Sequence, residues 1–175
     1  MCRKYNAIID MDKTDSTNIE PVTLIEAKRH IQIDFNDLDL LITDFIKASR
    51  VALEKYTGLS LVSSEAVVIL RNEKGGVELP YGPYEEDSIE MFDRDNKPVT
   101  DFKITGIKFP VIEEPITDYL RVTYECGYTA QTIPYDLKRA ICQQVAYMNE
   151  NRGDGKLSES AMELAKPYKS KVWLL

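Results

Sequence analysis

The chain has 175 residues and carries 29 acidic against 22 basic side chains, which gives a formal net charge of −7. This length suits one domain, or one domain with a large insertion, and the apolar share is sufficient for a hydrophobic core. The acidic balance argues against a tight DNA-binding protein, because such proteins gain affinity by neutralising phosphates with Lys and Arg.

The sequence also lacks the features of a membrane protein or a disulfide-rich protein. It contains no run of about 18 apolar residues, and residues 1–18 lack the apolar core of a signal peptide. The three cysteines are odd in number and far apart, which argues against a disulfide scaffold. We therefore expect no membrane partner and synthesis in a reducing, intracellular compartment.

Two helices are predicted in the N-terminal third, after residues 1–19, which we expect to form a short strand or a loose arm. Thr23 and Glu26 form a capping-box signature, and they predict a helix of about two turns that ends at His30 or Ile31. A second, long helix is expected to begin at Asn36 as its N-cap and to end at Gly58.

The long helix shows a helical repeat of apolar side chains. The predicted buried stripe consists of Leu38, Leu41, Phe45, Ala48, Ala52 and Tyr56, and Ile42, Ile46 and Leu53 widen it. This repeat leaves Lys47, Arg50, Glu54 and Lys55 for solvent or for a neighbouring subunit.

Residues 64–128 change to short runs of β-branched and aromatic side chains, separated by turn clusters. The runs AVVIL, GVELP, SIEMF, PVTDFKI and DYLRVTYECGY predict four to six antiparallel strands in a small sandwich or barrel. In the last run Leu120, Val122 and Tyr124 alternate with polar residues, so one face of that strand should be buried.

Helices return after the strands. Pro134 predicts the first turn of a helix whose buried face carries Leu137, Ile141, Val145 and Met148. Ser158 opens a shorter helix that Pro167 limits. The last residues, Val172, Trp173, Leu174 and Leu175, either fold onto the protein's own core or are reserved for a partner, and the sequence leaves both readings open.

These elements predict an α+β protein, mainly a helical bundle built from both chain ends, with an antiparallel β insertion in the middle. Residues 1–62 and 130–175 would form the helical domain, and residues 63–129 would form the β-rich insertion.

No catalytic, cofactor-binding or metal-binding motif is found. The single histidine, His30, has no neighbouring metal-ligand or nucleophile spacing, and the acidic run that begins at Asp34 fails the calcium-loop pattern. We therefore expect no catalytic residue, no cofactor and no metal. Tyr81 and Tyr84 flank Gly82-Pro83, where they could form an exposed contact patch, although packing within the turn is the favoured interpretation.

Four segments carry a resemblance to a known family: PVTLIEAK at residues 21–28, YTG at 56–58, IPYDLKRAI at 133–141 and NENRG at 149–153. In this order the chain resembles the head-to-tail connector (adaptor or head-completion) proteins of long-tailed bacteriophages and prophages. The resemblance implies a purely structural virion protein at the neck, made in the cytoplasm of the bacterial host. It implies a ring of about a dozen copies that extends the DNA channel below the portal protein. The tail or a stopper protein would dock below, and DNA would be a passing cargo.

The resemblance suggests interface residues. Lys47, Arg50 and Glu54 on the long helix would face a neighbouring copy. Val172–Leu175 would reach the portal protein, and the β insertion with Tyr81 and Tyr84 would face outward or towards the tail.

Two rival functions are kept. A peptide- or sugar-binding module would need a concave aromatic patch around Tyr81, Tyr84 and Tyr128. A small hydrolase would need two carboxylates that converge in a pocket, one of them with a perturbed pKa, and the pairs Glu85/Glu86 and Glu113/Glu114 are the candidates.

Overall fold

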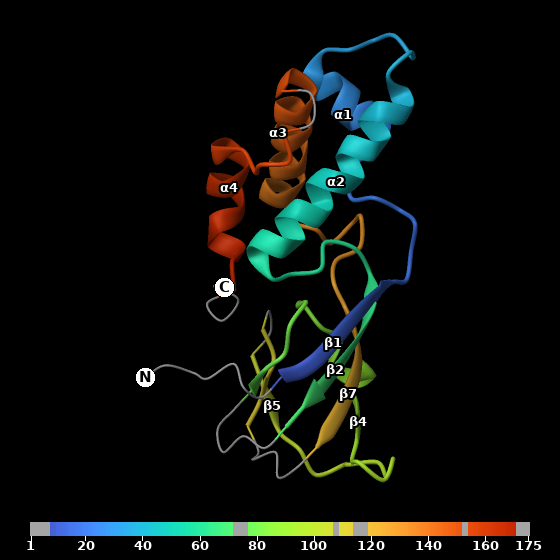
Figure 1. Cartoon of the computed structure of the whole chain (residues 1–175), viewed down its shortest axis with the longest axis vertical. Coiled ribbons are helices and arrows are strands. Elements are labelled where there is room, and N and C mark those ends of the chain that lie inside the picture. The colour runs from blue at the N-terminus through green and yellow to red at the C-terminus, as the bar shows by residue number, and fades with distance from the viewer. Residues whose placement is uncertain (1–7, 72–76, 107–108, 114–118, 152–153, 171–175) are drawn as a thin grey trace. The chain divides into compact units, whose positions relative to one another are not determined.

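The computed structural model describes residues 8–71, 77–106, 109–113, 119–151 and 154–170 (Figure 1). The chain divides into two compact units. Among the described residues, those of 18–62 and 128–170 form a helical unit, whereas those of 8–17 and 63–127 form a strand-rich unit. The α+β class is therefore confirmed. Residues 8–17, which the predicted division placed with the helices, group with the strands.

The helical unit contains α1 (Leu24–Ile31), α2 (Asp39–Thr57), α3 (Tyr135–Asn151) and α4 (Glu159–Ala165). The other three helices all pack against α3 (Figure 1). A 3-10 turn, Lys166–Tyr168, follows α4. Within the described residues, no helix combines the length and the apolar character needed to cross a membrane.

Local capping chemistry sets the helix ends. The Thr23 hydroxyl accepts the Glu26 amide while the Glu26 carboxylate accepts the Thr23 amide at 2.7 Å, so the predicted capping box is confirmed. The predicted end at His30 or Ile31 is also confirmed, and Ser158 caps α4 as expected. The predicted start of α2 is wrong, because its N-cap is Leu38 and no side chain caps it. Gly58 ends α2 with a φ of 76°.

The buried face of α2 is rotated from the one predicted. The buried residues are Ile42, Phe45, Ile46, Ser49, Arg50, Leu53 and Thr57, whereas Leu41 and Ala48 of the predicted stripe are exposed. Ser49 is small, and its hydroxyl lies 3.6 Å from the Met148 sulfur on α3, so the two helices approach closely on this side. The helix has two adjacent apolar stripes, and periodicity alone does not tell which of them meets α3.

On α3 the buried residues are Leu137, Ala140, Ile141, Cys142, Gln144 and Val145. Most of the predicted face is confirmed, with Met148 only partly buried. Gln144 also fixes the approach to α4. Its amide donates to the Lys156 carbonyl at 2.9 Å, and its carbonyl accepts the Ser158 amide at 2.7 Å. A buried amide whose donor and acceptor are both hydrogen-bonded favours one arrangement of the two segments that it joins.

The strand-rich unit has a four-stranded antiparallel sheet in the order β1-β2-β7-β4 and a three-stranded antiparallel sheet in the order β3-β6-β5. The strands are β1 (Ile8–Asp15), β2 (Ser64–Leu70), β3 (Val77–Glu78), β4 (Glu90–Phe92), β5 (Ile104–Thr105), β6 (Val111–Ile112) and β7 (Leu120–Cys126). Residues 8–15 are thus a full strand paired with β2, and β6 lies outside the predicted runs.

One apolar core holds this unit together. Ala66, Val68 and Leu70 of β2 are paired in register with Tyr124, Val122 and Leu120 of β7, and all six are buried. Val77 of β3, Ile112 of β6 and Leu79, which directly follows β3, belong to the same cluster. The alternation predicted for β7 is confirmed. The Tyr124 hydroxyl donates to the Pro80 carbonyl at 2.6 Å, and burial raises the pKa of Tyr124 well above its usual value.

Candidate functional site

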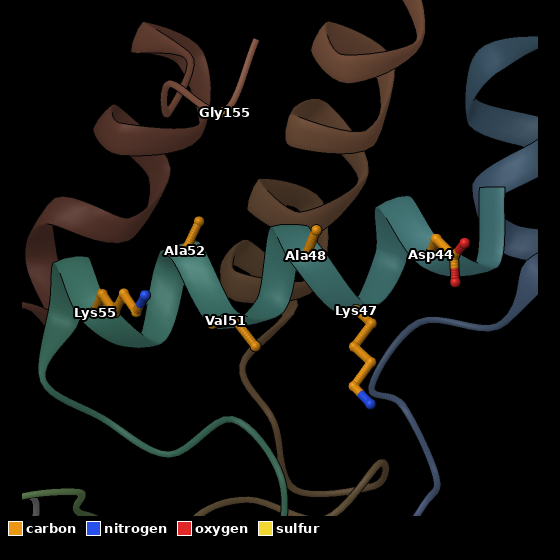
Figure 2. A pocket seen from close by; sticks show the side chains of 7 residues that line it. All are labelled: Asp44, Lys47, Ala48, Val51, Ala52, Lys55 and Gly155. Carbon is orange, nitrogen blue, oxygen red and sulfur yellow. The ribbon is translucent and has the colours of Figure 1, made fainter. Parts of the chain in front are cut away.

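The solvent face of α2 carries a shallow groove of about 440 Å³. Its lining consists of Asp44, Lys47, Ala48, Val51, Ala52, Lys55 and Gly155 (Figure 2). Ala48 and Ala52 point the same way from the helix, and Gly155 lies on that side. Small side chains four residues apart let another surface approach the helix closely, and the two lysines and Asp44 add charge around them. This groove includes Lys47, one of the predicted interface residues.

Arg50 lies elsewhere than predicted. Its side chain is only 3% exposed, and its Nε and Nη2 atoms donate to the Glu20 carboxylate at 2.8 and 3.2 Å. Its Nη1 donates to Glu54 at 3.2 Å, and the other Glu54 oxygen accepts the Leu61 amide at 2.8 Å. The expectation that Arg50 and Glu54 face solvent or a neighbour is therefore wrong. They join α2 to the segments before and after it inside one subunit, because α2 is rotated.

Tyr81 and Tyr84 pack against the core of the strand-rich unit and are only partly exposed. The Tyr84 hydroxyl donates to the Gly106 carbonyl at 3.1 Å, and burial, with a smaller effect of the nearby Glu86 carboxylate, raises the pKa of Tyr84. Packing within the turn, the favoured interpretation, describes both residues. The aromatic patch of the rival binding module also required Tyr128, which is buried in the helical unit.

The groups that could support chemistry have other roles. Burial, with a smaller effect of the Glu26 carboxylate, raises the pKa of the Cys142 thiol, so the thiol stays protonated and is a poor nucleophile. Hydrogen bonds lower the pKa of two carboxyls: those from Thr23 act on Glu26, and those from Lys103 and Thr105 act on Glu113. A lowered pKa is the opposite of what a general acid requires. Among the described residues, no three His, Cys, Asp or Glu side chains cluster as metal ligands.

The remaining predicted interface residues, Val172, Trp173, Leu174 and Leu175, lie outside the described residues. The chain that leads to them is held to the end of α2. The Ser170 amide donates to the Thr57 carbonyl at 2.7 Å, and the Lys169 ammonium lies 4.4 Å from the centre of the Tyr56 ring.

Sequence reasoning missed a second hollow of about 440 Å³, between α1 and α3. Arg29 and His30 from α1 and Lys138 and Arg139 from α3 line it, with Glu26, Val22, Tyr135 and Cys142. The only signal in the sequence is two basic pairs about 110 residues apart, and nothing in their spacing shows that the fold brings them together. The described residues therefore provide two candidate binding surfaces, the groove on α2 and the basic hollow between α1 and α3.

Comparison with known proteins shows what the chain is similar to. The sequence pattern of the family described as Phage gp6-like head-tail connector protein matches residues 21–86. This match runs from the capping box of α1 through α2 to the turn after β3, and it confirms the resemblance to head-tail connectors drawn from the sequence. Comparison with curated protein sequences found no match.

Solved structures extend the likeness to nearly the whole chain. A chain from the neck of an empty GTA particle, computed with C6 symmetry, is 17% identical with a TM-score of 0.71, and the alignment covers 91% of this chain and 95% of that one. A chain from the virion of a native gene transfer agent (GTA) particle is 20% identical with a TM-score of 0.70 and covers 90% and 95%. A chain from the neck of a native GTA particle, computed with C12 symmetry, is 19% identical with a TM-score of 0.65. At these identities the likeness shows a shared fold. Together with the family match, it supports a structural connector role in a virion and points away from an enzyme.

Proposed function

We propose that the chain is the subunit of a ring in the neck of a bacteriophage or related particle, below the portal protein, where the ring extends the DNA channel. The observation that carries this proposal is the agreement of two independent comparisons. The connector pattern lies on α1, α2 and the first strands of the insertion, and the fold of nearly the whole chain is that of neck proteins. One of the similar neck structures was computed with C12 symmetry, which supports a ring of about a dozen copies.

In this ring α2 and α3 form the body of each subunit, and the exposed face of α2 with Lys47 contacts a neighbour. The strand-rich unit faces outward or towards the tail, where the tail or a stopper protein docks. The residues after Ser170 reach the portal protein. The protein is not an enzyme, assembles in the cytoplasm of the bacterial host and uses no cofactor.

The charge of the chain suits a channel through which DNA passes. With 29 acidic against 22 basic side chains, the protein has a net charge of −7, so the phosphates of DNA are repelled and not held. A conduit for packaging and release benefits from this weak grip.

The test is electron microscopy of the full chain mixed with its portal protein. We expect a ring of added density on one face of the portal. A portal that shows no added density at saturating protein, or a virion neck from which the chain is missing, refutes the proposal.

A truncation tests the role of the tail. The contacts of Lys169 and Ser170 with α2 show where the cut belongs, namely after Ser170. We expect the shortened chain to keep the helical circular dichroism of the full chain and to lose portal binding. Unchanged binding removes the tail from the portal contact and leaves the ring untouched.

A further inference from the structure

The hollow between α1 and α3 gathers positive charge in an acidic protein. Arg29, Lys138 and Arg139 line it together with His30, and none of these three side chains makes an ion pair within 4 Å or a hydrogen bond with another described residue. Most of the cations described elsewhere in the chain have a carboxylate within 4 Å, such as Lys28 with Asp39 at 2.7 Å. Unpaired cations around a concavity form an anion-binding surface.

The one carboxylate of the hollow offsets only part of this charge. The hydrogen bonds from Thr23 lower the pKa of Glu26 most, and Lys138 and Arg29 lie near enough to add to that effect. Glu26 is engaged in the capping box, where one of its oxygens accepts both the amide and the hydroxyl of Thr23 at 2.7 Å. Three cations against one carboxylate leave a local excess of two positive charges, before His30 is counted, on a chain whose net charge is −7.

The floor of the hollow is apolar and decides which anion fits. Val22 is 2% exposed and Cys142 is 9% exposed, and the ring of Tyr135 stands 73% exposed at the rim. A DNA backbone offers phosphates but no apolar side chain to cover such a floor. An acidic peptide segment with an apolar side chain satisfies both features, because its carboxylates meet the rim while its side chain covers the floor.

The chain itself presents such a segment, the turn Asp34–Asp37 between α1 and α2. Phe35 is 50% exposed, and the carboxylates of Asp34 and Asp37 on either side are exposed without a described partner. The turn is anchored from behind, since the Lys28 ammonium donates to Asn36 at 2.9 Å and to Asp39 at 2.7 Å. An anchored turn loses little conformational entropy on binding.

Lys28, which holds the turn, and the α1 residues that line the hollow lie on opposite sides of α1. Glu26, Arg29 and His30, which line the hollow, share one side of α1. At 3.6 residues per turn, the direction of Lys28 is about 150° from the centre of that side. The contacts of Lys28 with Asn36 and Asp39 therefore hold the turn away from the subunit's own hollow. Two different surfaces on opposite sides are what a head-to-tail contact between copies requires.

We propose that the turn Asp34–Asp37 of one copy docks in the α1–α3 hollow of the next, with Phe35 over Val22 and Cys142 and the two aspartates against Arg29, Lys138 and Arg139. This inference rests on the proposed function and names the contact that closes its ring. It also explains how copies of an acidic protein associate, because the contact pairs opposite charges locally.

A charge-swap experiment on the full chain with its portal tests this. One variant carries Lys138→Glu with Arg139→Glu, a second carries Asp34→Lys with Asp37→Lys, and a third carries all four changes. The control carries Lys97→Glu with Lys103→Glu, two cations that are 73% and 68% exposed in the strand-rich unit. Ring formation is followed by electron microscopy and by the number of copies bound per portal, and folding is checked by circular dichroism.

We expect the first two variants to fold and to need at least about tenfold more protein for half-maximal ring formation. The third variant should recover ring formation, and the control should match the wild type. If the first two variants both form rings at the concentration that the wild type needs, the inference is wrong. The ring of the wild type still supports the proposed function in that case. Loss of ring formation in the Lys138→Glu and Arg139→Glu variant alone also overturns the inference, because the hollow then binds DNA or the portal protein. Failure of the third variant to recover refutes the pairing. A wild type that forms no ring refutes the proposed function itself.

Discussion

Replacement of Arg50 by Ala tests whether this side chain supports the fold or a contact with a neighbour. The guanidinium is 3% exposed and lies between Glu20, which is 23% exposed, and Glu54, which is 9% exposed. Removal of the cation leaves the Glu20 and Glu54 carboxylates without the positive charge of Arg50. Breaking a buried ion pair in this way costs about 3–5 kcal/mol. Because Glu20 keeps some contact with water, we expect a loss of about 3 kcal/mol, a large part of the roughly 5–15 kcal/mol that stabilises a typical domain.

The assay is urea unfolding followed by the circular dichroism of the helices. Lys47→Ala is the matched control, because Lys47 is on the same helix and exposed, and we expect a change within about 0.5 kcal/mol. The triple variant Arg50→Met, Glu20→Gln and Glu54→Gln should recover most of the loss. It removes all three charges together and keeps an amide oxygen that can accept the Leu61 amide. An Arg50→Ala protein as stable as the Lys47→Ala protein refutes the buried-network account.

Two other variants test the local chemistry of each unit. Hydrogen bonds hold the folded pKa of Glu26 below its ordinary 4.5, so this group stabilises the fold above that pH, and the contribution is lost as the pH falls through the folded pKa. Glu26→Gln can still complete the capping box but lacks the charge, so it should lower the stability at neutral pH slightly and make the decline below about pH 4.5 shallower in acid titrations. An unchanged acid limb contradicts this. In the strand-rich unit, Tyr124→Phe leaves the buried Pro80 carbonyl without its donor and should lower the free energy of unfolding by about 1–3 kcal/mol. Thermal unfolding measures this loss, and an equally stable variant contradicts the role of this hydrogen bond.

The features that could be predicted from the sequence depend on residues close together in the chain. The capping box at Thr23 and Glu26, the C-cap at Gly58 and the alternation in β7 each arise from contacts or periods within a few residues. The family resemblance also drew on such local patterns. Local signals therefore fixed the positions of most elements and the class of the protein.

The features that were mispredicted depend on partners far along the chain. Arg50 appeared exposed because its carboxylate partner Glu20 is 30 residues away, in a segment without a regular period. The first strand is short of apolar side chains, and its pairing with β2 depends on residues 49 to 62 positions later. The α1–α3 hollow could not be predicted for the same reason, because Arg29 and Arg139 line one hollow only once α1 packs on α3.

The distribution of charge reconciles two demands on a ring around DNA. A uniformly acidic surface would repel DNA but would also drive copies of the chain apart. A basic surface would help acidic copies to associate but would hold the phosphates of the cargo. In this chain the cations of α1 and α3 lie in a hollow with an apolar floor, and the carboxylates proposed to meet them lie in the exposed turn after α1. When copies meet head to tail, these cations are covered, and the surface left for DNA is more uniformly acidic than that of the isolated subunit. Assembly and weak affinity for DNA then follow from the same contact.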